Sequence, residues 1–155
     1  MKVLATLVAV CLMAIAYAVL AGSATAATPM CHGLASTMTG TAGADVIVGT
    51  AARDVIVARA GNDEVRGRGG RDVICAGRGA DEVSGGTRAD RVYGGRGEDD
   101  LIGGRGPDRL LGERGRDELH GNAAGDLLRG GSGVDEGFGG AGADTCLSVE
   151  FTHSC

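Results

Sequence analysis

Branched aliphatic residues return at every ninth position through most of this 155-residue chain. Cutting the sequence into units of nine residues from Gly40 gives twelve consecutive units, which end at Leu147. The eighth position of the first ten units is always Ile, Val or Leu, from Ile47 to Leu128. A disordered chain has no reason to keep such a register, so the pattern indicates a repeat protein.

Aspartate marks the sixth position of every unit. The first position is glycine in ten units and the fourth is glycine in nine. One aspartate, Asp100, lies outside this register. The twelve aspartates in register are Asp45, Asp54, Asp63, Asp72, Asp81, Asp90, Asp99, Asp108, Asp117, Asp126, Asp135 and Asp144.

Each unit divides into a turn and a short strand. Positions one to six are polar and rich in glycine, which suits a tight turn with positive φ angles. Positions seven to nine predict a minimal strand, with the eighth side chain turned inward and its neighbours turned outward. One inward residue cannot stabilise an isolated unit, so we expect the units to stack. With 30 glycines in the chain, a helical repeat is excluded.

The units "GGRGEDDLI", "GGRGPDRLL" and "GGAGADTCL" resemble the RTX, or haemolysin-type, calcium-binding nonapeptide G-G-x-G-x-D-x-U-x, where U is a large aliphatic residue. The resemblance implies an all-β fold, a right-handed parallel β-roll (solenoid) with two repeats per coil. The twelve repeats would make about six coils. Odd repeats would build one sheet and even repeats the other.

Stacking would place the aspartates in two columns, one for the odd repeats and one for the even repeats. Ionised carboxylates about 4.8 Å apart repel each other by roughly 0.9 kcal/mol in water and by more where water is excluded. A counterion is therefore expected, and the resemblance implies Ca²⁺ held between successive turns by the twelve aspartates and main-chain oxygens. Six turns on each edge enclose five gaps, which allows at most ten shared ions.

Two features complicate these sites. Repeats two, six and ten lack glycine at the fourth position, where they carry Ala52, Arg88 and Ala124. Several turns also contain arginine, so guanidinium groups could neutralise some aspartates and leave a roll that needs few ions.

The N-terminus predicts export. Residues 1–26 read as a signal peptide with an apolar core from Val3 to Leu20 and a cleavage motif at Ala24-Thr25-Ala26. The alternative is an uncleaved anchor, because this 18-residue core, apolar apart from Thr6, is nearly long enough to span a bilayer. We expect a secreted, extracellular protein with an N-terminal cap at 27–39, the β-roll at 40–147 and a C-terminal cap at 148–155.

Four cysteines remain after residue 26, and an even number in an oxidising compartment predicts two disulfides. Of the three possible connectivities, we favour Cys31 with Cys75 and Cys146 with Cys155. The inward row is interrupted at Gly137, where we expect Phe138 to turn inward instead.

The net charge and the positions of the histidines narrow the range of functions expected for this chain. Residues 27–155 hold 14 arginines against 20 acidic residues, a net charge of −6 that disfavours nucleic acid as a partner. The spacing of His32, His120 and His153 does not match that of metal ligands, and none of the three is paired with an evident nucleophile. We therefore predict a secreted, non-catalytic calcium-binding protein without stable membrane insertion after cleavage. The alternatives are a calcium-independent adhesin or structural roll and a fragment of a hydrolase; the sequence identifies no cell-surface or matrix partner.

Overall fold

The computed structural model describes residues 29–155. The predicted signal peptide, residues 1–26, lies outside the described residues. Between residues 29 and 155 the chain forms strands and turns, and no helix there could cross a membrane.

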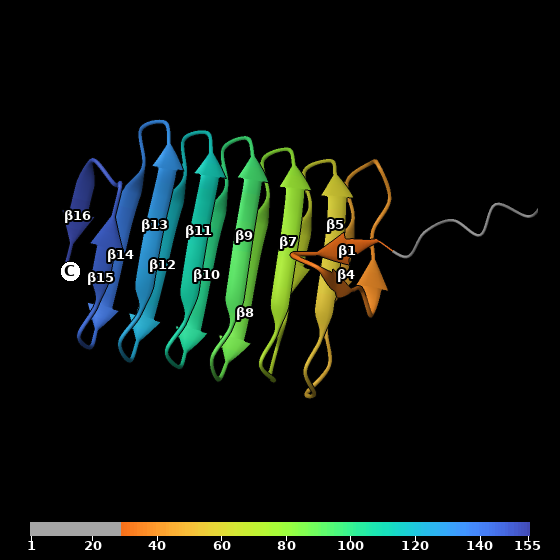
Figure 1. Cartoon of the computed structure of the whole chain (residues 1–155), viewed down its shortest axis with the longest axis horizontal. Coiled ribbons are helices and arrows are strands. Elements are labelled where there is room, and N and C mark those ends of the chain that lie inside the picture. Colours follow the sequence, from red (N-terminus) through yellow and green to blue (C-terminus); the bar gives the residue numbers. More distant parts are fainter. Residues whose placement is uncertain (1–28) are drawn as a thin grey trace, which may run out of the picture.

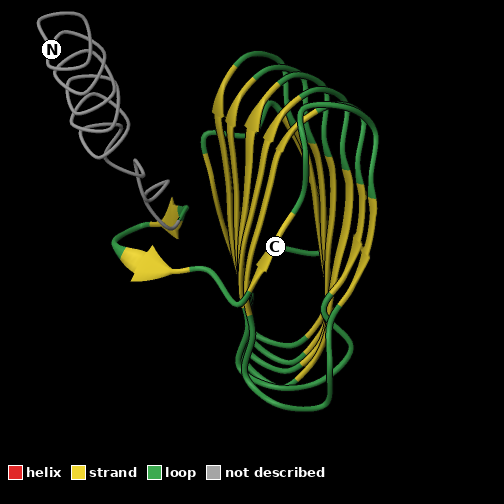
Figure 2. Ribbon diagram, turned by 90° about the vertical axis from the view of Figure 1, so that its right-hand side faces the viewer, coloured by secondary structure: helices red, strands yellow, loops and turns green. Residues whose placement is uncertain are grey.

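The strands form two parallel sheets of seven strands each and one short antiparallel hairpin. Viewed along the roll, the two sheets face each other and are joined by turns at both edges, while the hairpin lies outside (Figure 2). Successive strands enter the two sheets alternately, so the chain winds as a coil (Figure 1). This confirms the expected parallel β-roll.

The first sheet contains the even repeats: β3 (Met38–Thr39), β5 (Val55–Ala60), β7 (Val73–Arg78), β9 (Arg91–Arg96), β11 (Arg109–Arg114), β13 (Leu127–Ser132) and β15 (Thr145–Leu147). The second sheet contains the odd repeats: β4 (Val46–Val48), β6 (Glu64–Arg66), β8 (Glu82–Thr87), β10 (Asp100–Arg105), β12 (Glu118–Ala123), β14 (Glu136–Ala141) and β16 (Phe151–His153). The hairpin pairs β1 (Met30–Cys31) with β2 (Leu34–Ala35).

Strand pairing follows the repeat. Leu101 is paired with Val83 on one side and with Leu119 on the other, a step of two repeats. One coil therefore consists of two repeats, as the resemblance implies, and residues at one repeat position form straight columns along the roll.

Most strands are longer than the pattern predicts. Nine of them have six residues, because each continues through position three of the next repeat, where positions two and three also pair, as Gly104 does with Gly86. Position one faces inward, and position two often lies in the left-handed region, as at Gly95 with φ 119°. Glycine thus continues the strand instead of ending it, and the prediction of three-residue strands was wrong.

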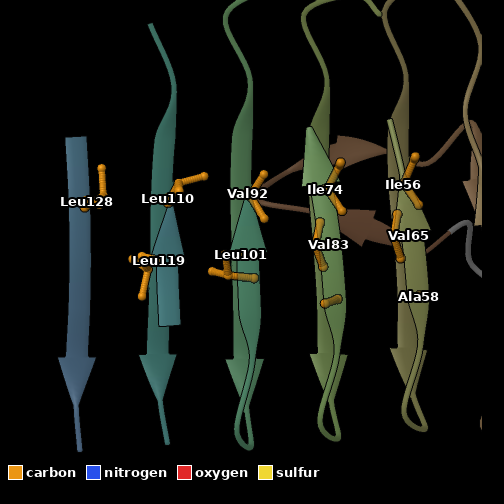
Figure 3. Close-up of a cluster of buried hydrophobic side chains, with 11 residues drawn as sticks. Ile56, Ala58, Val65, Ile74, Val83, Val92, Leu101, Leu110, Leu119 and Leu128 are labelled. Atoms are coloured by element: carbon orange, nitrogen blue, oxygen red, sulfur yellow. The ribbon is translucent and has the colours of Figure 1, made fainter. Parts of the chain in front are cut away.

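The core is one cluster of aliphatic side chains between the sheets, with one row contributed by each sheet (Figure 3). The fully buried residues at the eighth position are Ile56, Val65, Ile74, Val83, Val92, Leu101, Leu110, Leu119 and Leu128. Ala58 and Ala76, at the first position, complete the same cluster, and Met38, Ile47 and Cys146 pack against it. The aliphatic period therefore marks the interior.

A second, smaller apolar cluster lies outside the roll. The hairpin β1–β2 packs on the outer face of the first sheet, where Cys31 and Leu34 contact the group Val55, Val57, Val73, Cys75 and Tyr93. A Cys31–Cys75 disulfide fixes the hairpin to β7, as expected. The assignment of residues 27–39 as an N-terminal cap stays a prediction. Within this range, β3 adds a strand beside β5.

The C-terminal residues continue the coil. β16 pairs with β14, and the expected Cys146–Cys155 disulfide closes this end. The prediction for Phe138 was wrong, because its ring stacks between His120 and His153 on the outer face. Val149 lies beside Gly137 instead, about 3.4 Å from where a Cβ would stand.

Candidate metal centre

The aspartates form two columns, one along each turn edge of the roll. The odd column leads into the strands of the second sheet and the even column into those of the first. Ten of the twelve side chains, Asp54 to Asp135, are at most 5% exposed. A groove of about 820 Å³ follows the even column, and one of about 300 Å³ follows the odd column at Asp99, Asp117 and Asp135.

One oxygen of each aspartate carboxylate ties successive coils together. The Asp108 Oδ1 accepts a hydrogen bond of 2.8 Å from the backbone N–H of Asp90, one coil earlier. The same bond, 2.8–3.1 Å long, recurs at all ten aspartates from Asp63 to Asp144. At the end of the odd column, Glu150 Oε2 accepts the N–H of Asp135 at 2.6 Å and takes the place of the next aspartate.

The other oxygen of the same ten carboxylates has no partner. The Oδ2 atoms of Asp63, Asp72, Asp81, Asp90, Asp99, Asp108, Asp117, Asp126, Asp135 and Asp144 are buried without a hydrogen bond. An unpartnered buried polar atom costs about 1–3 kcal/mol. Ten of them would cancel the about 5–15 kcal/mol that stabilises an ordinary domain. These oxygens therefore require a proton or a cation.

Glycine leaves room beside each unpartnered oxygen. A Cβ on Gly94, at the first position of its repeat, would stand 2.5 Å from Asp99 Oδ2 and 3.0 Å from the carbonyl oxygen of Gly112. The same crowding by the aspartate of the same repeat recurs at Gly67, Gly85 and Gly121. The space that a side chain would fill is thus lined by carboxylate and carbonyl oxygens, the ligands that Ca²⁺ prefers.

The first two repeats differ from the other ten. Threonine occupies their second position, and Thr50 donates both its N–H (2.7 Å) and its hydroxyl (2.9 Å) to Asp54 Oδ2. Thr41 contacts Asp45 Oδ2 in the same way, at 2.6 and 3.0 Å. In these turns the threonine supplies what a cation would supply elsewhere.

Burial raises the pKa of eight repeat aspartates. Loss of hydration is the largest cause, opposed by the backbone hydrogen bond and reinforced in most of them by the neighbouring carboxylate of the column. The pKa rises to about 7 at Asp99 and Asp108 and to about 6 at Asp90 and Asp117; it also rises at Asp72, Asp81, Asp126 and Asp135. Without a cation, the middle of each column binds protons near neutral pH.

Arginine does not provide the counter-charge. In the part of the chain that the structure describes, no guanidinium lies within 4.0 Å of a repeat aspartate, and Arg66 with Glu64 is the one arginine ion pair. Arg53, Arg71, Arg91 and Arg109 line the even groove without reaching the carboxylates. The alternative of an arginine-neutralised roll therefore finds no contact that supports it.

Main-chain oxygens must supply most ligands of any ion held here. Among residues 29–155, no three Asp, Glu, His or Cys side chains converge on one point. The turns keep the required backbone even where the repeat lacks glycine, since Arg88 and Ala124 have φ angles of 81° and 96°. Ala52 is not among the residues with positive φ, so the second repeat departs in backbone as well as in sequence.

Sequence reasoning anticipated the two columns but not the unequal use of the two carboxylate oxygens. At the sixth position of the repeat, one carboxylate oxygen must accept an N–H and the other must face an ion. This double requirement explains why the sixth position is never asparagine. The hydrogen bonds from threonine to Oδ2, which we call the threonine closure, had a signal in the sequence. Thr41 and Thr50 are the two threonines at the second position of a repeat.

Comparison with known families agrees with this geometry. The family model described as RTX calcium-binding nonapeptide repeat (4 copies) matches residues 39–74, 76–110 and 111–146. A comparison with curated proteins gives no match. Since the matched segments cover more than half of the chain, this protein belongs to the RTX calcium-binding nonapeptide repeat family.

Proposed function

We propose that this protein is a secreted, non-catalytic calcium-binding protein whose roll is stabilised by ions along both turn edges. The observation that carries the proposal is the set of ten buried Oδ2 atoms without a partner. A proton could neutralise some of these oxygens. At the pH of most extracellular fluids, a hard divalent cation can neutralise all of them. Mg²⁺ should compete poorly, because it demands a tighter octahedron and retains its water.

The expected ligands are the repeat aspartates and the turn carbonyls around them. All twelve aspartates are candidates from sequence, and the contacts now favour the ten from Asp63 to Asp144. Asp45 and Asp54 are already bonded by threonine. Among the ten, Asp63 and Asp81 follow Ala58 and Ala76, whose methyl groups stand where other repeats have glycine. We expect these two to bind calcium more weakly than the others.

Export fits the chemistry of the sites. Extracellular modules bind calcium with dissociation constants of about 10⁻⁴–10⁻³ M, so such a roll stays empty in calcium-poor cytosol and fills outside. The two disulfides also suit an oxidising compartment. The three histidines are paired with glutamates and stacked on aromatic rings.

Calcium titration after chelation tests the proposal. Far-ultraviolet circular dichroism of residues 27–155 should show a cooperative gain of β signal as calcium is added in the range of about 10⁻⁴–10⁻³ M, and magnesium should not reproduce it. Equilibrium dialysis with metal analysis should then count several ions, up to ten. A β signal that is complete in chelator, with no bound calcium, would refute the calcium function and leave the fold intact.

A further inference from the structure

The two outer faces of the roll carry opposite charge. The strands of the first sheet contain seven arginines and one glutamate, whereas those of the second contain five acidic residues and two arginines. The fold therefore separates charges that are mixed in the sequence.

Arginines on the first sheet stand in rows across the strands. Arg78 is paired with Arg96 across β7 and β9, and Arg96 with Arg114 across β9 and β11. All three side chains are exposed. Like charges directly opposite each other destabilise a sheet, and within residues 29–155 no carboxylate lies within 4.0 Å of these guanidinium groups. This row lacks a counter-charge, as the aspartate columns do.

A groove runs beside the row. It has a volume of about 280 Å³ and is lined by the three arginines together with Arg59, Tyr93, His32 and Glu113. The hairpin forms one wall, where His32 stacks on Tyr93 with ring centroids 3.7 Å apart. Figure 1 shows β1 across β5 and β7, whereas β9 and β11 stay uncovered in front. The one carboxylate of the groove, Glu113, faces His32 at 3.9 Å.

We propose that this groove binds a linear acidic polysaccharide that lies along the roll axis over the arginine row. Strands in a sheet are about 4.8 Å apart, close to the length of one sugar ring, so carboxylate or sulfate groups on successive sugars can meet successive guanidinium groups. Arginine is suited to such contacts, because its planar fork binds oxyanions through two hydrogen bonds.

Nucleic acid fits this surface less well. Single-stranded chains are bound by aromatic side chains on which bases stack, and one face of Tyr93 is already covered by His32. A flat sheet face does not enter a duplex groove.

Fluorescence anisotropy with a labelled heparin oligosaccharide tests the proposal, using the calcium-loaded chain after its β signal has been verified. The triple variant Arg78→Gln/Arg96→Gln/Arg114→Gln should bind at least about tenfold more weakly, since three exposed ion contacts are lost. Its binding should also depend less on salt. The matched control Arg66→Gln/Arg68→Gln/Arg105→Gln removes the same charge away from the first sheet and should bind as the wild type does. Calcium titrations should be unchanged in both variants, which separates this inference from the calcium function.

A measurement on the wild-type chain does not depend on the folding of any variant. Heparin should protect Arg78, Arg96 and Arg114 from phenylglyoxal and leave Arg66, Arg68 and Arg105 reactive, as read by mass spectrometry. Equal loss of binding in both triple variants, or equal protection at all six arginines, would overturn the proposed groove. Tighter binding of single-stranded DNA than of heparin would overturn the choice of ligand, and no binding of either would overturn both.

Discussion

The first coil and the coils that follow it place the same aspartate at the same point of the repeat but satisfy it differently. In repeats one and two, threonine donates two hydrogen bonds to the Oδ2 of Asp45 and Asp54. In repeats three to twelve, that oxygen is buried without a partner. The first coil is also covered by the hairpin that the Cys31–Cys75 disulfide holds in place. One end of the roll is thus held by side chains and a covalent bond, whereas the corresponding oxygen in the other repeats has no such partner.

The largest effect on stability should come from the disulfide that holds the hairpin over this first coil. Its cysteines are 44 residues apart, whereas Cys146 and Cys155 are 9 apart. Chain entropy then gives about 4 kcal/mol for the first bond and about 2.6 kcal/mol for the second. Denaturant unfolding in calcium should show the larger loss for Cys31→Ala/Cys75→Ala than for Cys146→Ala/Cys155→Ala. The reverse order would mean that the hairpin adds little to the first coil.

A glycine at the fourth position should matter in a later coil and not in the first. A Cβ on Gly115 would collide with the carbonyl oxygen of Gly97, at a φ of 142°. Nothing lies within 4 Å of a Cβ on Gly43, at the same position of repeat one. Gly115→Ala should therefore cost about 3 kcal/mol or more, and Gly43→Ala should stay within about 0.5 kcal/mol of wild type. Thermal unfolding in saturating calcium compares the two, and similar losses would contradict the difference between the coils.

Replacing one aspartate by asparagine should affect calcium in the later coils alone. Asparagine keeps an oxygen for the N–H of the preceding coil, so Asp108→Asn removes charge at the orphaned atom and retains the ladder bond. Mutation of a residue that only hydrogen-bonds to a metal ligand already lowers the affinity for the metal by about 10–100-fold. We expect at least that loss at the affected site, with one or two fewer ions in equilibrium dialysis. Asp54→Asn is the matched control and should leave the number of bound ions unchanged.

Acidity should act in opposite directions with and without calcium. The raised pKa values mean that the ion-free roll keeps protons up to about pH 6–7 at Asp90, Asp99, Asp108 and Asp117, whereas an unfolded chain loses them near the ordinary aspartate pKa of 3.8. Between these limits the native state binds more protons, so its free energy of unfolding falls as the pH rises. In chelator, denaturant unfolding should show a more stable roll at about pH 5 than at about pH 8.

With calcium the protons compete with the ions. The calcium concentration at half-saturation should therefore rise as the pH falls through the same window. The double variant Asp99→Asn/Asp108→Asn removes the two most strongly raised groups and should flatten both pH profiles. An ion-free roll that becomes more stable toward pH 8 would show that the aspartates are not protonated in the native state.

The repeat period specifies the register of this fold more completely than its local detail. A column of aliphatic residues at the eighth position can be buried only if successive coils align. Sheet membership and the aspartate columns follow from this spacing together with the two repeats per coil that the family resemblance implies. The lengths of the strands do not, because glycine at position two pairs as readily as a larger residue. The position of the hairpin could not be predicted either, since residues 29–35 carry no period. Phe138 was misplaced because the tail beyond the repeats supplies Val149 beside Gly137.

The smallest expected effect addresses the threonine closure itself. Thr41→Gly changes the first repeat to "GGAGADVIV", which satisfies the nonapeptide pattern and frees Asp45 Oδ2 from the Thr41 hydroxyl. Loss of this hydrogen bond should lower the stability in chelator by about 1 kcal/mol, and calcium binding should increase by at most one ion. Thr41→Val is the matched control, because it removes the hydroxyl, keeps the branched side chain and should gain no ion. If Thr41→Gly loses stability and gains no calcium, the closure is not what excludes an ion from the first coil, and the missing neighbour at the end of the column is the better explanation.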